Sequence, residues 1–370
     1  MTAPVQRPNA SSGHGSARVK RRAWGRMPSG ALVHAYELTN ARGTAVTVLT
    51  LGAIITSIRL AGRGGTLDDV VLGMTDVEGY LTRSPYFGAV TGRFGNRIAR
   101  GRFTLDGVAF QLATNNPPNH LHGGVVGFDK HVYTARAVRG AEGAGVRLTL
   151  TSPDGDEGYP GEVHFAVRYL LGDDDRLTID YEATTTRATP INPSQHTYWN
   201  LAGAQRDDIL DHRLQLNATR YTPVDATLIP TGELAAVEGT PFDFRTPMRL
   251  GARIGEAHQQ LQFGHGYDHN FVVEAPSRRG RAVHAATLHD PLSGRTLDVY
   301  TTEPGVQLYT GNWLDGTAVG KGGRRYAAHA GVCLETQHFP DAPNQPHFPS
   351  TIVRPGRAFR SRTVFAFSVR

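Results

Sequence analysis

The chain has 370 residues but a single cysteine, Cys333, and only three lysines, Lys20, Lys130 and Lys321. With one cysteine no intrachain disulfide can form, so we expect a reducing compartment, with the cytoplasm as the default location. No segment approaches the ~20 apolar residues of a membrane-spanning helix, and no membrane partner is expected. Aromatic residues make up 8% of the chain, whereas 43 glycines and 22 prolines suit many turns between short strands.

The sequence also lacks a broadly distributed positive charge, although its formal net charge is +6. Basic residues before Glu37, the first acidic residue, account for all of this excess, and the remaining basic residues equal the 33 acidic ones in number. A uniformly basic binding face is therefore not supported, and no nucleic-acid partner is expected. Residues 1–22 are rich in Ser, Gly, Ala, Pro and Arg. We expect a disordered basic leader there, followed by one domain over residues 23–370.

Several well-known catalytic motifs are missing. The sequence has no Gly-x-Ser-x-Gly elbow, no Walker loop, and no Gly-x-Gly-x-x-Gly turn between a strand and a helix. Cys333 has no helix start beside it to lower its pKa, so a buried thiol is expected rather than a nucleophile. The leader has no apolar core and is not expected to act as a secretory signal.

What the sequence does contain is alternation with a period of two. Val163, Phe165, Val167 and Tyr169 alternate with polar or smaller residues, and similar patterns run over residues 177–183 and 364–369. The pair Asp106-Gly107 between two short apolar runs predicts a hairpin. No convincing helix of 12 or more residues is found. These patterns predict an all-β fold, a large antiparallel sandwich with long functional loops and few short helices.

The most informative segment covers residues 331–349. Glu335 follows a short apolar run and precedes amides, imidazoles and four prolines. In a strand, residues two apart share a face, so Glu335 and Gln337 should point the same way. A carboxylate in such a position suits a general base, although a solvated glutamate at the end of a strand would be the simpler reading of this residue alone.

Two further clusters lie in the first third of the chain. Residues 92–99 combine glycines with Asn96 and Arg97, which are donors for oxygen-rich ligands. Residues 115–124 contain His120 and His122, which would share one face of an extended segment. That spacing allows a metal site, but glycines rather than a carboxylate follow it, so catalytic or packed histidines are favoured over metal ligands.

Two more clusters follow. In a strand over residues 190–201, His196, Tyr198 and Asn200 would face together and offer an imidazole, a phenol and an amide. In residues 264–273, Asp268 enters a strand where it could accept hydrogen bonds from ligand hydroxyls, or simply cap a turn. Together the clusters suit acid–base chemistry on a neutral polyhydroxylated ligand.

The residues of these clusters, and the order of the clusters along the chain, resemble those of the aldose 1-epimerase (galactose mutarotase) family. The similar segments run in family order from about residue 30 to the C-terminus; they are residues 92–99, 115–130, 154–161, 195–201, 267–273, 304–312 and 334–349. The resemblance implies a single β-supersandwich domain, no cofactor, and interconversion of the α and β anomers of hexoses such as galactose and glucose. The expected partner is the sugar substrate, and the chain is expected to be a monomer or a homodimer.

The resemblance also assigns roles by position. It implies that Glu335 is the general base, that His196 is the general acid, and that His122 contacts the region of the ring oxygen. The implied sugar-binding set consists of Asn96, Arg97, Tyr198, Asp268 and Gln307, and no metal is implied. The reference pKa values, about 4.3 for Glu and about 6.5 for His, would let the two groups exchange a proton with substrate near neutral pH.

Two departures from the family pattern bear on the pocket. Tyr133 stands where a Trp is usual, and Pro117-Pro118 replaces the commoner Gly-Pro; either could reshape a pocket edge. Three alternatives stay open at this point: a non-catalytic sugar-binding or sugar-sensing module, a mutarotase of phosphorylated hexoses, and a metal-dependent sugar isomerase. The first would not need both Glu335 and His196, the second would need more cations, and the third would need a carboxylate after His122.

Overall fold

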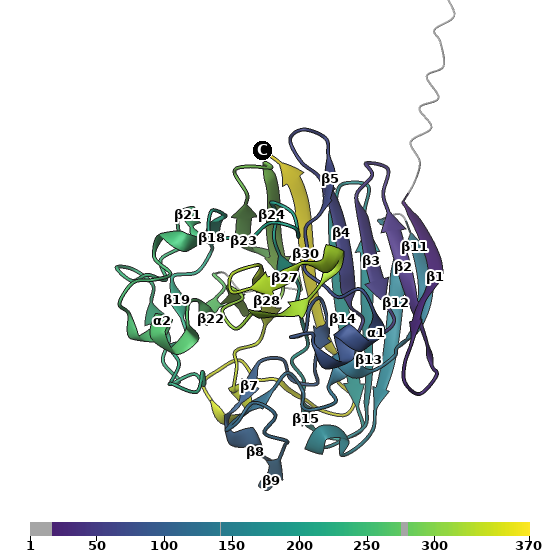
Figure 1. Ribbon diagram of the computed structural model, residues 1–370. Helices are drawn as coiled ribbons and strands as arrows, with labels where there is room; N and C mark the ends of the chain where they lie inside the picture. Colours follow the sequence, from purple (N-terminus) through teal and green to yellow (C-terminus); the bar gives the residue numbers. More distant parts are fainter. Residues whose placement is uncertain (1–16, 141, 275–279) are drawn as a thin grey trace, which may run out of the picture.

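The structure of the protein, a computed structural model, describes residues 17–140, 142–274 and 280–370. It confirms the predicted all-β architecture, with strands arranged in packed antiparallel sheets (Figure 1). In the described residues the α-helices are two short ones, α1 (Val77–Thr82) and α2 (Gln259–Gly264). No helix in the part that the structure describes is long and apolar enough to cross a membrane.

The largest sheet has nine strands and crosses the whole molecule. Its alternating residues put Val167, Ile179 and Phe365 on the inner face and Arg168, Asp180 and Arg362 on the outer face. The strands follow the order β11 (Thr134–Gly140), β12 (Gly143–Ser152), β13 (Val163–Leu171), β14 (Arg176–Thr185), β30 (Phe359–Val369), β24 (Arg295–Thr301), β23 (Val283–His289), β18 (Arg213–Leu216) and β21 (Met248–Arg249).

A five-stranded sheet packs on one half of this inner face. Val46 and Ile58 from this sheet share one hydrophobic core with Val146 and Val167 from the nine-stranded sheet, and Figure 1 shows the two sheets layered against each other. Its strands run in sequence order: β1 (Arg18–Arg26), β2 (Leu32–Thr39), β3 (Ala45–Leu49), β4 (Ile55–Ala61) and β5 (Leu67–Asp69).

The structure corrects the expected boundary of the leader. Residues 18–22, which we expected to be disordered, belong to β1 and pair antiparallel with β2. Val19 packs against the core and the Trp24 ring contacts that of Tyr80 in a tilted arrangement, so the edge strand buries more apolar surface than its composition suggests. The basic side chains remain exposed, as suits an edge strand. Residues 1–16 of the expected leader lie outside the described residues.

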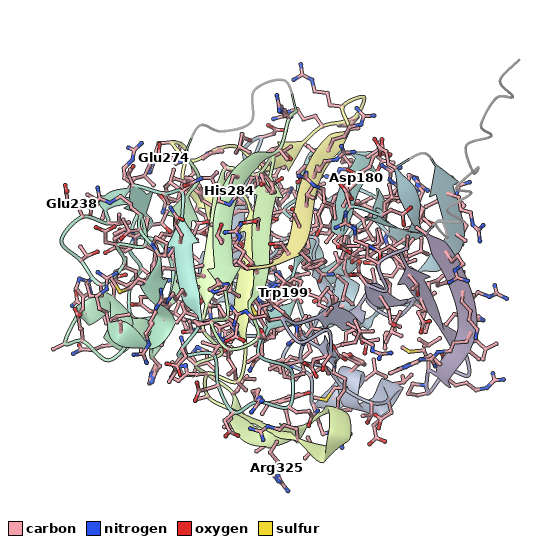
Figure 2. All side chains as sticks on the ribbon, turned by 90° about the horizontal axis from the view of Figure 1, so that it is seen from above. Asp180, Trp199, Glu238, Glu274, His284 and Arg325 are labelled. Carbon is pink, nitrogen blue, oxygen red and sulfur yellow. The ribbon has the colours of Figure 1, made fainter. Side chains whose placement is uncertain are left out.

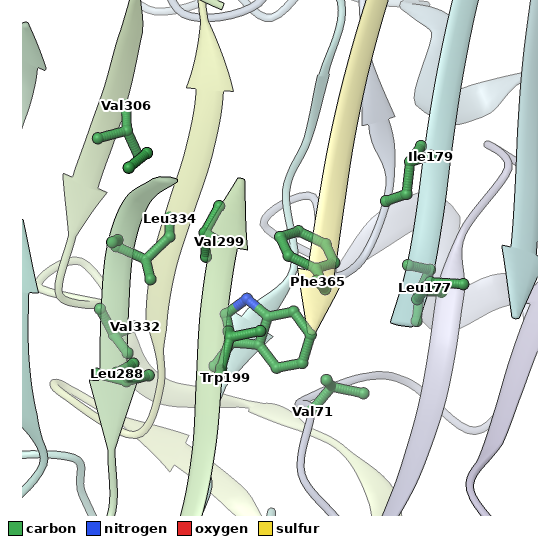
Figure 3. Close-up of a cluster of buried hydrophobic side chains, with 14 of the residues drawn as sticks. Val71, Leu177, Ile179, Trp199, Leu288, Val299, Val306, Val332, Leu334 and Phe365 are labelled. Atoms are coloured by element: carbon green, nitrogen blue, oxygen red, sulfur yellow. The ribbon is translucent and has the colours of Figure 1, made fainter. Parts of the chain in front are cut away.

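A six-stranded sheet packs on the other half of the nine-stranded sheet. Its apolar face is formed by residues such as Val306, Val332 and Leu334, which lie opposite Val299 and Phe365 (Figure 3). Trp199 is fully buried at this junction and meets Phe365 edge-on at 5.0 Å. The order is β17 (Tyr198–Trp199), β28 (Val332–Gln337), β25 (Gly305–Tyr309), β22 (Asp268–Val272), β19 (Arg220–Tyr221) and β20 (Ala235–Ala236).

Short two-stranded ribbons and 3₁₀ turns form the loops that surround the sheets. The predicted hairpin is confirmed: Asp106 and Gly107 both have positive φ, as a tight two-residue turn requires. The ribbons are β7 (Arg97–Ile98) with β10 (His120–Leu121), β6 (Val90–Thr91) with β16 (Ser194–Gln195), β8 (Arg102–Leu105) with β9 (Val108–Gln111), β15 (Thr189–Pro190) with β29 (Ile352–Val353), and β26 (Asp315–Val319) with β27 (Arg325–Ala327). The 3₁₀ turns are η1 (Ala99–Gly101), η2 (Phe128–Lys130), η3 (Asp156–Gly158), η4 (Leu250–Ala252), η5 (Lys321–Gly323) and η6 (Ala342–Asn344).

Candidate active site

The second face of the six-stranded sheet carries polar residues. On β28, β25 and β22 the apolar residues point to the core, and their neighbours point to the opposite face. Register places Glu335 directly opposite Gln307, and Cys333 directly opposite Tyr309, which in turn pairs with Asp268. Three strands that are far apart in sequence therefore bring their polar residues to one surface.

Loops close this surface into a pocket with a volume of about 440 Å³. Seven of the eight predicted site residues line it; they are Asn96, Arg97, His122, His196, Tyr198, Asp268 and Glu335. The eighth, Gln307, lies behind the lining, where its amide nitrogen donates to Asp268 Oδ1 at 2.6 Å. Gln337 in turn donates to Gln307 Oε1 at 3.4 Å, so a chain of amides holds the Asp268 carboxylate in place.

Glu335 and His196 face each other at the bottom of the pocket. His196 Nε2 lies 3.5 Å from Glu335 Oε1, and both side chains are buried. Glu335 Oε2 is buried without a hydrogen-bond partner among the described residues, which is costly for a carboxylate and leaves an acceptor free for a ligand. On its other side, His196 Nδ1 lies 3.5 Å from the Cys333 thiol.

Burial reverses the ordinary order of these two pKa values. It raises the pKa of the Glu335 carboxyl well above its usual 4.5, with a further rise from the Asp268 charge and an opposing effect of Arg97. The same desolvation lowers the pKa of His196 to about 4. The expectation from reference values, in which His is the weaker acid, therefore does not hold in the folded protein. A single proton shared by the pair is therefore held by the carboxyl in preference to the imidazole.

His122 sits beside this pair in a fixed tautomer. Its Nδ1 accepts a hydrogen bond from the Asn96 backbone N–H at 3.1 Å, and its ring meets His196 at 5.0 Å. Burial lowers the pKa of His122 well below its ordinary value, and the neighbouring His196 adds to the effect. A neutral ring whose Nδ1 accepts must carry its proton on Nε2, so His122 is a hydrogen-bond donor.

Arg97 supplies the cation of the pocket lining. Its Nε donates to Asn116 Oδ1 at 3.1 Å, and its Nη1 lies 3.9 Å from Asp268 Oδ2. Burial raises the pKa of Asp268, whereas Arg97 and the Gln307 hydrogen bond oppose the rise. The neighbouring Arg93 has a structural role, because its guanidinium is buried against the carbonyls of Pro160 and Gly161.

The structure separates two sets of residues that the sequence placed on common faces. His120 does not join His122: its ring nitrogens contact Ala113 O and Tyr159 Oη, and His122 has a φ of 51° that turns it the other way. The expectation that these two histidines share one face is therefore wrong. Among the described residues, His122, His196 and Glu335 have possible ligand atoms that lie close enough together to hold a metal ion.

The other separation concerns residues 196–200. His196 and Tyr198 stack with ring centres 5.0 Å apart, but Asn200 donates to Ala330 O, away from the pocket. Strand β17 ends at Trp199 and the chain turns, which breaks the alternation. The Tyr198 hydroxyl donates to Pro85 O at 3.0 Å, so this side chain packs against His196 with its hydroxyl already engaged.

Several lining residues were missed from the sequence. Tyr309 had a usable signal, because it lies two residues after Gln307 and therefore on the same strand face. Tyr86, whose ring lies 4.5 Å from that of His122, and the half-exposed Trp313 at the rim come from loops without a repeating pattern. Of the two departures noted above, Pro117-Pro118 lines the pocket, whereas Tyr133 is buried in the core.

Comparisons with known proteins identify the family to which this chain belongs. A sequence model of the aldose 1-epimerase family matches residues 34–366. The galactose mutarotase of Bos taurus is 47% identical over 352 residues, which cover 95% of this chain and 99% of the relative, and the aldose 1-epimerase of Escherichia coli K12 is 36% identical over 92% of this chain and 96% of its own. The crystal structure of galactose 1-epimerase from Lactobacillus acidophilus superposes with a TM-score of 0.84 at 29% identity, covering 96% of this chain and 99% of that one. The chain belongs to the aldose 1-epimerase family.

Proposed function

We propose that this protein is an isomerase that interconverts the α and β anomers of free hexoses such as galactose and glucose. The observation that carries the proposal is the facing pair of Glu335 and His196 in the pocket, where the Glu335 Oε2 atom has no partner in the described chain. We also propose that the chain from β1 onward acts as one domain and that the protein works in the cytoplasm, as its lone cysteine suggests.

The proposed reaction opens and recloses a cyclic hemiacetal. Glu335 takes the proton of the anomeric hydroxyl while His196 gives a proton to the ring oxygen, the C1–O5 bond breaks, and an aldehyde forms. Rotation about C1–C2 presents the other carbonyl face, and the two groups return the protons in reverse. Each positioned proton transfer is typically worth ~10²–10⁴-fold in rate.

The inverted pKa order suits both directions of this cycle. A carboxylate whose pKa is raised is a stronger base, and an imidazolium whose pKa is lowered is a stronger acid. The form needed for ring opening, with the proton on His196, differs from the resting form by one proton shift within the pair. That shift moves no net charge into or out of the pocket, but it is uphill, because the carboxyl binds the proton more tightly than the imidazole does.

The remaining residues are assigned to the sugar. His122 donates from Nε2 toward the ring-oxygen region, and Arg97 with Asp268 holds hydroxyls as donor and acceptor. Asn96 orients His122 and Arg97, because its backbone N–H donates to His122 Nδ1 and its side-chain oxygen accepts from Arg97 N. Gln307 acts through Asp268, and Tyr198 through His196.

A mutarotase of phosphorylated hexoses is less well supported. Arg97 is the cation among the residues that line the pocket, and Asp268 already neutralises it in part. A phosphate would bring further negative charge beside Glu335 and Asp268 without a second cation to receive it.

Polarimetry on freshly dissolved α-galactose and α-glucose tests the proposal. Glu335→Gln and His196→Asn should each lower kcat by about 10²-fold or more while KM changes little. The matched control is Glu182→Gln on the outer face of the nine-stranded sheet, which should keep the wild-type rate. Wild-type protein that binds sugar yet never exceeds the buffer rate would establish a binding module instead.

The same assay decides how His122, His196 and Glu335 are used. If they carry protons, as proposed, treatment with EDTA leaves the rate unchanged. Loss of turnover in EDTA, restored by one divalent ion, would make these three residues ligands of a metal-dependent isomerase.

A further inference from the structure

A second polar pocket lies on the outer face of the nine-stranded sheet. Its volume is about 680 Å³, and five arginines and two carboxylates are among its lining residues. It shares no lining residue with the active-site pocket. Figure 2 labels Asp180 in this region, next to the yellow strand β30.

Strand register arranges most of these charges in one row. Arg136 on β11 lies directly opposite Arg147 on β12, which lies opposite Arg168 on β13. The row continues through Asp180 on β14 to Arg362 on β30. We call these five residues the arginine row.

The two ends of the arginine row differ in how their charges are balanced. Asp180 accepts from Arg168 at 2.5 Å and from Arg362 at 2.6 Å, so it neutralises one end and orients both guanidinium groups. Arg136 and Arg147 have no acidic partner in residues 17–140, 142–274 and 280–370. The uncompensated positive charge therefore lies at Arg136 and Arg147, next to the paired Arg168.

This placement is unfavourable for the empty protein. Directly opposed residues on neighbouring strands have Cβ atoms about 5 Å apart, and like charges at such positions destabilise a sheet. Outward-facing strand positions tolerate many polar residues, and the adjacent row has uncharged Thr149 opposite Ala166. A local arrangement that costs stability without a compensating contact is expected at functional sites.

We propose that the arginine row is a binding site for a small, multiply charged anion that carries phosphate groups. Guanidinium groups pair with phosphate oxygens through two parallel hydrogen bonds, and three adjacent arginines offer several such forks. The volume lies within the ~300–1,000 Å³ of small-molecule sites. The carboxylates of Asp180 and Glu182 at one side restrict the anion to the end formed by Arg136, Arg147 and Arg168.

Calorimetry and thermal unfolding with inorganic pyrophosphate test the site on the full-length protein. Pyrophosphate should raise the melting temperature more than sodium chloride does at equal ionic strength, because a specific site resists screening better than a diffuse field. The double variant Arg136→Gln/Arg147→Gln should weaken binding by about tenfold or more. Without the anion, the same variant should melt about 1 °C higher, because the opposed charges are gone.

The matched control is Arg59→Gln/Arg139→Gln, which removes two exposed arginines outside the pocket lining and should leave pyrophosphate binding unchanged. Arg147→Lys keeps the charge but loses the fork, and it should bind more weakly than wild type. Anomerase activity should be unaffected by all of these changes, and it reports that each variant is folded.

Three results would overturn the proposal. One is an equal response to pyrophosphate and to chloride at the same ionic strength. Another is an equal loss of binding in the control variant. The third is tighter binding of a short single-stranded oligonucleotide than of pyrophosphate through the same arginines, which would make this face a nucleic-acid surface.

Discussion

The pocket and the arginine row use the same kinds of charged residue in opposite surroundings. In the pocket, Arg97 and Asp268 are separated by 3.9 Å, and about 10% of each side chain is exposed. In the row, Arg168 and Asp180 approach to 2.5 Å, with 36% and 23% of the side chains exposed. The closer pair is the better hydrated one. Water screens its attraction, so the wider pair in the pocket should matter more for both stability and function.

The same contrast explains why function is concentrated in the pocket. Desolvation shifts the pKa values of Glu335, His196, His122 and Asp268 together, because these groups share one buried volume. Perturbed groups that converge in a cleft are typical of catalytic sites. On the sheet face, charge is organised by strand register instead, and it remains available to ligands from solution.

The same substitution, made in both regions, tests whether burial distinguishes their ion pairs. Asp268→Asn should lower kcat/KM by about 10²-fold, because Arg97 loses its buried partner and the sugar loses an acceptor. Asp180→Asn removes a shorter ion pair but should leave the rate unchanged and cost about 1 kcal/mol or less of stability. Polarimetry and thermal unfolding of both variants provide the measurement. Equal effects on activity would show that burial does not distinguish the two sites.

The pH dependence of kcat/KM tests the inverted order of the Glu335 and His196 pKa values. The active pair holds one proton, so the rate should fall at low pH when a second proton is added, near the His196 pKa of about 4. At high pH the rate should fall only when the Glu335 carboxyl loses the remaining proton of the pair, and burial raises the pKa of this carboxyl. The plateau of the rate should therefore begin just above pH 4 and extend upward to the raised pKa of Glu335. A narrow bell with limbs near the ordinary values of Glu and His would contradict the inverted order.

The ionisation of Glu335 should have a small effect on the free energy of unfolding. The pKa of Glu335 is raised in the folded state, so the fold loses stability as pH rises above the unfolded value of 4.5 toward the folded value. Glu335→Gln removes this loss and should raise the free energy of unfolding by about 1 kcal/mol at pH 8, with a smaller gain at pH 4. Glu182→Gln, which breaks an exposed pair with Arg360, should cost less than about 1 kcal/mol at pH 8. Urea unfolding at both pH values measures the difference, and a loss of stability in Glu335→Gln would refute the argument.

Much of the fold and part of the site follow from local patterns. Alternation over residues 163–169 and 177–183 predicts strands, because the character of each side chain indicates the face on which it lies, and strands β13 and β14 are found there. The Asp106-Gly107 turn is encoded by two residues that tolerate positive φ. For the site, the same logic places Glu335 with Gln337 on one face of β28. It fails at His122 and Asn200, where the backbone leaves the extended conformation and the period of two no longer applies.

The amino-acid sequence alone predicts the strands that keep a regular period of two, their apolar faces, and the polar side chains that alternate with them. Tertiary structure alone decided that Glu335, His196 and His122 converge, that Gln307 lies behind Asp268, and that Arg136, Arg147 and Arg168 stand in one row. Alternation is a property of neighbours along the chain, whereas register and depth of burial arise from contacts between distant segments. The inverted pKa order of Glu335 and His196 depends on that depth, because desolvation acts only once the sheets and loops have closed around the two groups.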